Sequence, residues 1–249
     1  MNFKILLKKI FLKSQLYVSL CASLLGIFVL KEQEFYQINF ALVIFLTFWN
    51  GYLFTIFHKK KTALLINFIG FLLISFLILY FINIDFYYRW IIVLILGALY
   101  NADIFNINVR EFSLLKTFYV GFVWALTLVF LPLQNFNWSW FFIIFLFVSA
   151  ITFPFEIRDM DRDPFPTIPK VIGIKNTKIL SIIFLLLSGI LAYFYLQKDF
   201  AMAWLITVLI SIISIIFSGK KRSYEYYSIY LESLSTMPML IYFILNLKN

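Results

Sequence analysis

The sequence predicts an all-α integral membrane protein, a single transmembrane domain over residues 1–249 with nine transmembrane helices. Of its 249 residues, 63% are hydrophobic and only 13% are charged, whereas a soluble domain carries roughly 25% charged residues. The apolar residues also form continuous runs, many of about the length that a bilayer requires. Only helices and closed barrels span lipid, and runs without polar alternation predict helices.

Each predicted span is bounded by a short polar connection. The first apolar run follows a basic start, but no small-x-small cleavage site precedes Lys31, so we expect it to be retained as a span. The fourth is short for a bilayer, and we expect it to be tilted or shielded by its neighbours. The nine spans are predicted at about 14–30, 38–57, 63–82, 90–102, 114–131, 139–155, 179–196, 201–218 and 226–246.

The basic residues segregate between the two sets of connections. One set carries few, namely Lys31, Arg89, Lys198 and Lys248. Short connections rich in Lys and Arg are typical of the cytoplasmic side, so the sequence predicts the N-terminus inside and the C-terminus outside, in a bacterial inner membrane. The net charge of +9 is therefore assigned to topology and not to nucleic acid. The rich set holds Lys4, Lys8, Lys9, Lys13, Lys59, Lys60, Lys61, Arg110, Lys116, Arg158, Arg162, Lys170, Lys175, Lys178, Lys220, Lys221 and Arg222.

The densest group of charges lies at the end of the sixth span. Glu156, Asp159 and Asp163 are spaced i, i+3, i+7, which would place three carboxylates on one face of a helix. Carboxylate oxygens suit Mg²⁺, which often binds one or two of them together with substrate phosphates. The alternative is a solvated, charged loop, and Asp161, off the stripe, is interpreted in that way. With one cysteine and one histidine in the chain, a disulfide or a metal site built on these residues is not expected.

The residues after this group carry a family resemblance. Thr167-Ile168-Pro169 and Gly173 follow the acidic positions, and the whole segment resembles the second aspartate-rich motif of the UbiA superfamily of intramembrane prenyltransferases, with Glu156 for its first aspartate. Residues 110–116 and Trp124, after Tyr100, resemble the basic stretch that enters the fifth helix of that family. The family also has nine helices, with its acidic motifs on cytoplasmic connections after the second and sixth.

The resemblance implies a bundle whose central cavity opens to the cytoplasmic side. It implies transfer of an isoprenyl group from an isoprenyl diphosphate to a lipophilic acceptor, with Mg²⁺ held by Glu156, Asp159 and Asp163. Asp159, Asp163 and Lys116 would be the catalytic residues. The residues expected to bind the diphosphate are Asn50, Lys59, Lys60, Arg110, Arg158 and Lys170.

The first aspartate-rich motif of the family is not retained. Of Asn-Asp-x-x-Asp-x-x-x-Asp only Asn50 remains, and Gly51, Phe54 and His58 stand at the carboxylate positions. The chain is then a divergent transferase that uses Lys59–Lys61 in place of a second metal, or a non-catalytic relative that binds an isoprenoid lipid or a partner enzyme. An unrelated carrier or channel is the third alternative, for which Glu232, in a span that Pro238 would kink, is the main intramembrane charge.

Overall fold

The computed structural model describes residues 15–57, 59–100, 114–163 and 165–247, and these residues form helices and no strands. This agrees with the predicted all-α class. In chain order the elements are α2 (Leu16–Glu32), α3 (Ile38–Phe57), α4 (Lys61–Phe81), α5 (Ile84–Leu99), α6 (Lys116–Ala125) with the π-helix η2 (Leu126–Phe130), α7 (Trp138–Asp159), α8 (Ile168–Tyr195), α9 (Lys198–Phe217), the π-helix η3 (Tyr226–Leu231) and α10 (Met237–Asn246).

Several helices are long and apolar enough to cross a membrane. Five meet that requirement within the described residues, namely α3, α4, α7, α8 and α9. The outer face of α4 exposes large apolar side chains, including Leu65, Phe68 and Phe76. Lipid accepts such a face and water does not, so the structure is consistent with a helical membrane protein.

The predicted starts of two spans, at residues 90 and 179, are too late because polar residues lie inside the first turns of α5 and α8. Helix α5 begins at Ile84, because the Asn83 side chain accepts a hydrogen bond from the Phe86 amide (2.8 Å) and caps it. Arg89 within α5 donates to the backbone carbonyls of Leu133 and Phe130. Helix α8 begins eleven residues before the predicted span, with a break at Gly173.

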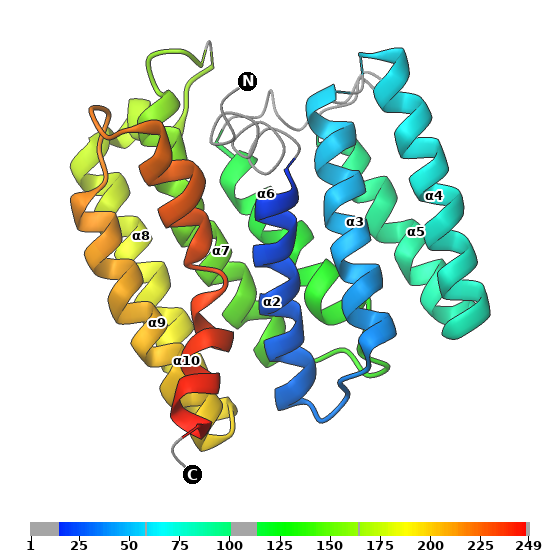
Figure 1. Ribbon diagram of the computed structural model, residues 1–249. Coiled ribbons are helices and arrows are strands. Elements are labelled where there is room, and N and C mark those ends of the chain that lie inside the picture. The colour runs from blue at the N-terminus through cyan, green and yellow to red at the C-terminus, as the bar shows by residue number, and fades with distance from the viewer. Residues whose placement is uncertain (1–14, 58, 101–113, 164, 248–249) are drawn as a thin grey trace, which may run out of the picture.

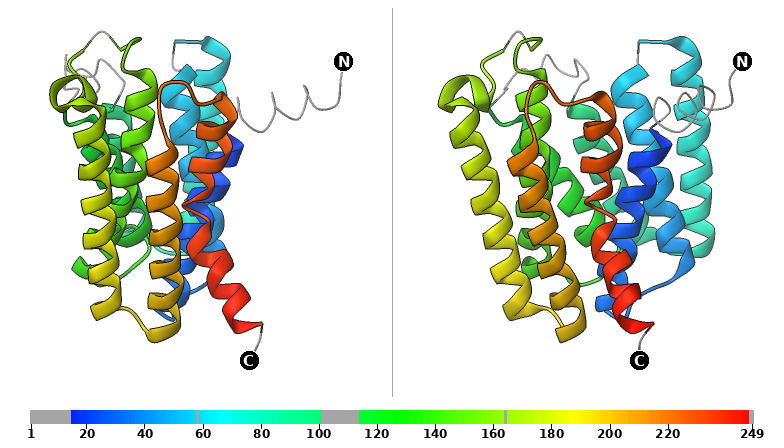
Figure 2. Two further views of the ribbon diagram at one scale, coloured as in Figure 1. Left: turned by 90° about the vertical axis from the view of Figure 1, so that its left-hand side faces the viewer. Right: turned by 60° about the vertical axis from the view of Figure 1, so that its left-hand side comes forward.

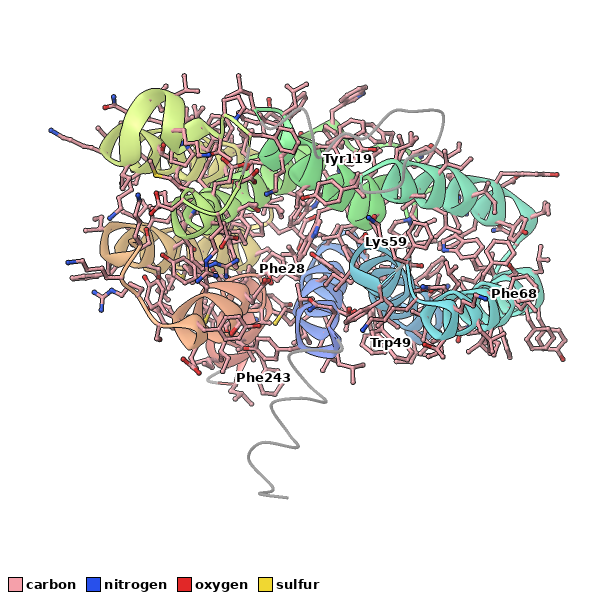
Figure 3. All side chains as sticks on the ribbon, turned by 90° about the horizontal axis from the view of Figure 1, so that it is seen from above. Phe28, Trp49, Lys59, Phe68, Tyr119 and Phe243 are labelled. Carbon is pink, nitrogen blue, oxygen red and sulfur yellow. The ribbon has the colours of Figure 1, made fainter. Side chains whose placement is uncertain are left out.

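The helices form two layers. Viewed along the bundle, α8, α7, α6 and α5 make one row, and α9, α10, α2, α3 and α4 make the other (Figure 3). Phe28 of α2 lies between the rows and packs against the rings of Trp140 and Trp204, with ring centroids 5.9 Å away in each case. Serines support the close contacts of α8, because Ser181 and Ser188 donate to carbonyls of α7 at 2.7 and 2.8 Å.

One end of the bundle carries the charged connections. Residues 59–60, 160–163, 165–167 and 218–225 all lie at the end opposite to the C-terminus (Figures 1 and 2); we call it the charged end. Connections 33–37, 82–83 and 196–197 lie at the other end. The charge segregation in the sequence therefore corresponds to the two ends of the bundle wherever the structure describes the chain.

Candidate functional site

The three predicted metal ligands do not form a continuous stripe. Helix α7 ends at Asp159, and the Asp163 amide then donates to the Asp159 carbonyl (2.9 Å) in a turn. Because Asp163 lies beyond the helix, the i, i+7 spacing does not place it on the same helical face as Glu156. The prediction of three carboxylates along one helix face is wrong for this reason.

Each of these carboxylates has partners of its own. Asp159 accepts two hydrogen bonds from the Arg158 guanidinium, at 2.8 and 2.6 Å, and that guanidinium also lies over the rings of Phe155 and Tyr227. Arg158 is thus engaged by a neighbouring acid. A bidentate pair of this kind fixes both side chains.

Asp163 and Glu156 face α6 instead. Asp163 pairs with Lys116 at 3.4 Å, and Lys170 donates to the Asp163 backbone carbonyl. The buried Glu156 carboxylate accepts from Thr117 through one oxygen, while its other oxygen has no hydrogen-bond partner. The predicted residues Lys116, Lys170, Glu156 and Asp163 are therefore brought together where α6, α7 and α8 meet.

This arrangement does not fit the expected Mg²⁺ site. Among the described residues no group of three or more Asp, Glu, His or Cys side chains could hold a metal ion. Mg²⁺ needs hard oxygen ligands in a near-octahedral set, whereas Asp159 is occupied by Arg158 and Asp163 by Lys116. Asp159 and Asp163 instead neutralise cations of the same chain.

Two other predicted residues, Lys59 and Lys60, lie at the charged end but outside this group. Lys59 and Lys60 follow α3, and the Lys60 ammonium group lies 5.2 Å from the centre of the Phe57 ring. Arg110, like His58 and the basic residues before Gln15, lies outside the described residues. Asn50 belongs to a cavity in which the acidic residues take no part.

That cavity lies between α3, α4, α5 and α6 and has a volume of about 350 Å³. We call it the α3–α6 cavity. Its wall is mostly aromatic and aliphatic, and Figure 3 labels one of its residues, Tyr119, which belongs to the first turn of α6. The lining residues include Thr47, Asn50, Gly51, Tyr52, Phe54, Asn67, Gly97, Tyr119, Trp124 and Thr127.

The depth of the cavity follows from the helices that form it. At 1.5 Å per residue, Tyr119 lies about 5 Å and Thr127 about 16 Å beyond the start of α6. Asn50 and Asn67 lie roughly 10 Å from the ends of α3 and α4 that face the charged end. The cavity therefore extends about 16 Å into the bundle from the charged end, which is roughly half of the 30 Å thickness of a bilayer's hydrocarbon core.

Two positions of the missing first motif line this cavity. Gly51 and Phe54 stand where the family carries carboxylates, and both belong to the wall. A Cβ atom placed on Gly51 would meet no atom within 4 Å, so the glycine leaves open space. An apolar wall thus replaces half of the metal cradle that the resemblance implies.

A second, smaller pocket of about 200 Å³ contains Glu232. It is lined by polar and aromatic side chains of α2, α7 and the segment around η3, including Tyr17, Arg158 and Ser228. The Glu232 carboxylate makes no hydrogen bond or ion pair within the described part of the chain. The helix is interrupted at residues 234–236, just before Pro238, as the sequence predicts.

Two buried polar residues were missed by the sequence reasoning. Asn67 lines the α3–α6 cavity and is a lone amide in an apolar run, which is the signal that could have found it. Glu32 accepts hydrogen bonds from the Trp140 indole (2.7 Å) and the Gln197 amide (3.2 Å). Glu32 thereby joins α2, α7 and the connection before α9, and its role is structural.

Comparison with protein-family models, with curated proteins and with solved structures gives no match for this chain. The UbiA resemblance therefore stays a prediction that rests on the motifs and on the order of the spans.

Proposed function

We propose that the chain is a UbiA-like membrane protein that binds an isoprenoid lipid in the α3–α6 cavity. The observation that carries the proposal is the cavity itself, a mostly apolar space of about 350 Å³ that four helices line. Small-molecule sites occupy roughly 300–1,000 Å³ and are mostly apolar with a few polar groups. A branched, unsaturated chain matches such a wall in shape and polarity, and it would enter from the bilayer.

The proposal includes the full topology. All nine predicted spans would cross the membrane, with the charged end in the cytoplasm and the C-terminus outside, in a bacterial inner membrane. The cavity would then be reached from the cytoplasmic half of the bilayer. Its ligand would be a membrane lipid rather than a solute.

A divergent prenyltransferase is the second candidate. The observation in its favour is the convergence of Lys116, Lys170 and Asp163 where α6, α7 and α8 meet, beside the unpartnered oxygen of Glu156. Cations in that position would attract the diphosphate of an isoprenyl donor. The engaged carboxylates count against a bound metal, and for that reason we place lipid binding first.

Filling the cavity tests the first candidate. We expect saturable binding of tritiated farnesol to the purified protein in detergent micelles, after subtraction of empty micelles. Gly51→Leu projects a side chain into the cavity and should weaken binding at least tenfold, which corresponds to about 1.4 kcal/mol. Gly219→Leu is the matched control, because its Cβ also meets no atom within 4 Å and Gly219 lies outside the cavity.

The outcomes separate the two candidates. Equal binding by the wild type and Gly51→Leu, or no saturable binding at all, would refute the lipid-binding proposal. Incubation with farnesyl diphosphate and a lipophilic acceptor, with and without Mg²⁺, tests the other. Prenylated product that requires Mg²⁺ and is lost in Asp163→Asn would establish the transferase.

A further inference from the structure

The second pocket holds two opposite charges that do not pair with each other. It has a volume of about 200 Å³, and Glu232 and Arg158 both line it. The Glu232 carboxylate makes no hydrogen bond or ion pair within the described part of the chain, and neither of its oxygens is among the buried atoms without a partner. Both oxygens therefore keep accessible surface, although the residue is partly buried. An unpaired acid inside a bundle that lipid surrounds indicates a functional site.

Arg158 is engaged by partners other than Glu232. Its guanidinium donates to Asp159 through Nε (2.8 Å) and Nη2 (2.6 Å). It also lies 5.3 Å from the centre of the Phe155 ring and 5.1 Å from that of Tyr227. The third nitrogen, Nη1, makes no hydrogen bond to the described residues and is not among the buried atoms without a partner. The pocket thus presents an accessible N–H donor in addition to the accessible carboxylate.

Aromatic rings form much of the remaining wall. Tyr17 of α2 donates to the Ile229 carbonyl at 3.3 Å and shares a hydrogen bond with the Ser233 hydroxyl. These contacts fix the Tyr17 ring between α2 and η3. Tyr224 and Phe155 supply two further rings. Aromatic rings attract ammonium groups that lie over their faces, so a carboxylate among such rings suits an organic ammonium group.

The pocket lies next to the charged end of the bundle. Arg158 is the last residue but one of α7, and Tyr224 belongs to the connection at that end. Glu232 follows Glu225 by seven residues, which places it roughly 10 Å deeper. In a membrane this is the level at which lipid head groups and aqueous solutes both occur. Its ligand is therefore expected to be polar, unlike that of the α3–α6 cavity.

We infer that this pocket binds a phosphoethanolamine group, with the ammonium at Glu232 and the phosphate at Arg158. A ligand with only a positive charge would meet Arg158 as a like charge, and one with only a negative charge would meet Glu232. A zwitterion pairs with both through charge-assisted hydrogen bonds. About seven groups of water size fit into the pocket at roughly 30 Å³ each, which is the size of such a group. The pocket shares no lining residue with the α3–α6 cavity, so the inference goes beyond the function proposed above.

The experiment compares ligands that carry one charge or both. Binding of O-phosphoethanolamine, of ethanolamine and of glycerol 1-phosphate is measured by calorimetric titration of the full chain in detergent micelles. The wild type should bind O-phosphoethanolamine at least tenfold more tightly than either of the other two, because each of those lacks one charged hydrogen-bonding group. Equal affinity for all three ligands, or no saturable binding of O-phosphoethanolamine, would overturn the inference.

Glu232→Gln removes the charge of the carboxylate and keeps the shape of the side chain. It should weaken O-phosphoethanolamine binding at least tenfold. Glycerol 1-phosphate should bind this variant at least as tightly as the wild type, because a like charge is gone. Glu225→Gln is the matched control, since it makes the same change at an exposed residue that does not line the pocket. It should leave the affinities for all three ligands unchanged.

A second measurement guards against misfolding of the variant. Because the Glu232 carboxylate has no partner, ligand-free Glu232→Gln should melt at or above the melting temperature of the wild type. O-Phosphoethanolamine should then raise the melting temperature of the wild type more than that of the variant. A variant that melts below the wild type, or one that gains as much from the ligand, would contradict the inference.

Native mass spectrometry separates the two sources of the group. If a lipid supplies it, the wild type should retain dioleoyl phosphatidylethanolamine over dioleoyl phosphatidylglycerol, and Glu232→Gln should show no preference. Equal retention of the two lipids, together with tight binding of O-phosphoethanolamine, would assign the site to a soluble zwitterion. Farnesol binding in the α3–α6 cavity should be the same in the wild type and in Glu232→Gln. Failure of the Glu232 site would therefore leave the proposed function untouched.

Discussion

Gly121 gives the sharpest test of how the helices pack. It lies on α6 where that helix approaches α7, and a Cβ atom added there would lie 2.8 Å from the backbone carbonyl oxygen of Phe145 and closer still to the Ser149 hydroxyl. An ordinary contact begins at 3.4 Å, so the helices would have to separate by about 0.6 Å. Because the obstacle includes backbone, no rotamer change relieves it.

The expected change in the free energy of unfolding of Gly121→Ala is the sum of two opposing effects. Overpacking costs typically 1–3 kcal/mol, and a backbone obstacle favours the upper end, about 3 kcal/mol. Alanine in place of glycine within a helix recovers about 1 kcal/mol. Gly121→Ala should therefore destabilise by about 2 kcal/mol. Gly51→Ala, where the new methyl group meets open space, should stabilise by about 0.5–1 kcal/mol.

The free energies of unfolding of Gly121→Ala and Gly51→Ala can be compared by equilibrium unfolding in mixed micelles with an increasing mole fraction of dodecyl sulfate. The double variant Gly121→Ala/Ser149→Ala should recover part of the loss, because the hydroxyl is gone but the Phe145 carbonyl remains. Equal stability of Gly121→Ala and Gly51→Ala would refute the close approach of α6 and α7.

Two further predictions concern topology and the break in α8. Single cysteines that replace Lys60 and Lys175 should be labelled by an impermeant maleimide from the same side of the membrane. A cysteine that replaces Gln197 should be labelled from the opposite side. Labelling of positions 60 and 175 from opposite sides would refute the nine-span topology. Gly173 has φ 81° and ψ 159°, a region that is essentially restricted to glycine, so Gly173→Ala should cost about 1–3 kcal/mol. Gly219→Ala is its control in thermal unfolding, and equal melting temperatures for the two would show that the strained backbone at Gly173 is unimportant.

The helical architecture could be predicted because composition and run length act locally. A continuous apolar run must form a helix in lipid, whatever its neighbours are. The missed start of α5 shows where this reasoning ends. Asp85 and Arg89 looked like parts of a connection, but Arg89 is accommodated by carbonyls at residues 130 and 133, more than forty positions along the chain.

The position of the acidic cluster could be predicted from the sequence, but the cations with which its carboxylates pair could not. Charge density near a span singles out Glu156, Asp159 and Asp163, and the structure keeps them at one end of the bundle. Whether they converge depends on where α7 ends and on which cation lies nearest. Arg158, the next residue in the chain, captures Asp159, and Lys116 from α6 captures Asp163; periodicity alone does not encode such a competition.

The residues that differ from the motif which the sequence resembles also form part of the wall of the α3–α6 cavity. Sequence comparison presents Gly51 and Phe54 as losses, because carboxylates are missing there. In three dimensions both residues line the cavity, and the missing side chain of Gly51 leaves open space there. A carboxylate at Gly51 would put a charge into an apolar wall that has no cation beside it among the described residues, at a high desolvation cost. The residues that leave these positions without carboxylates therefore also give the cavity the apolar wall that the proposed lipid ligand requires.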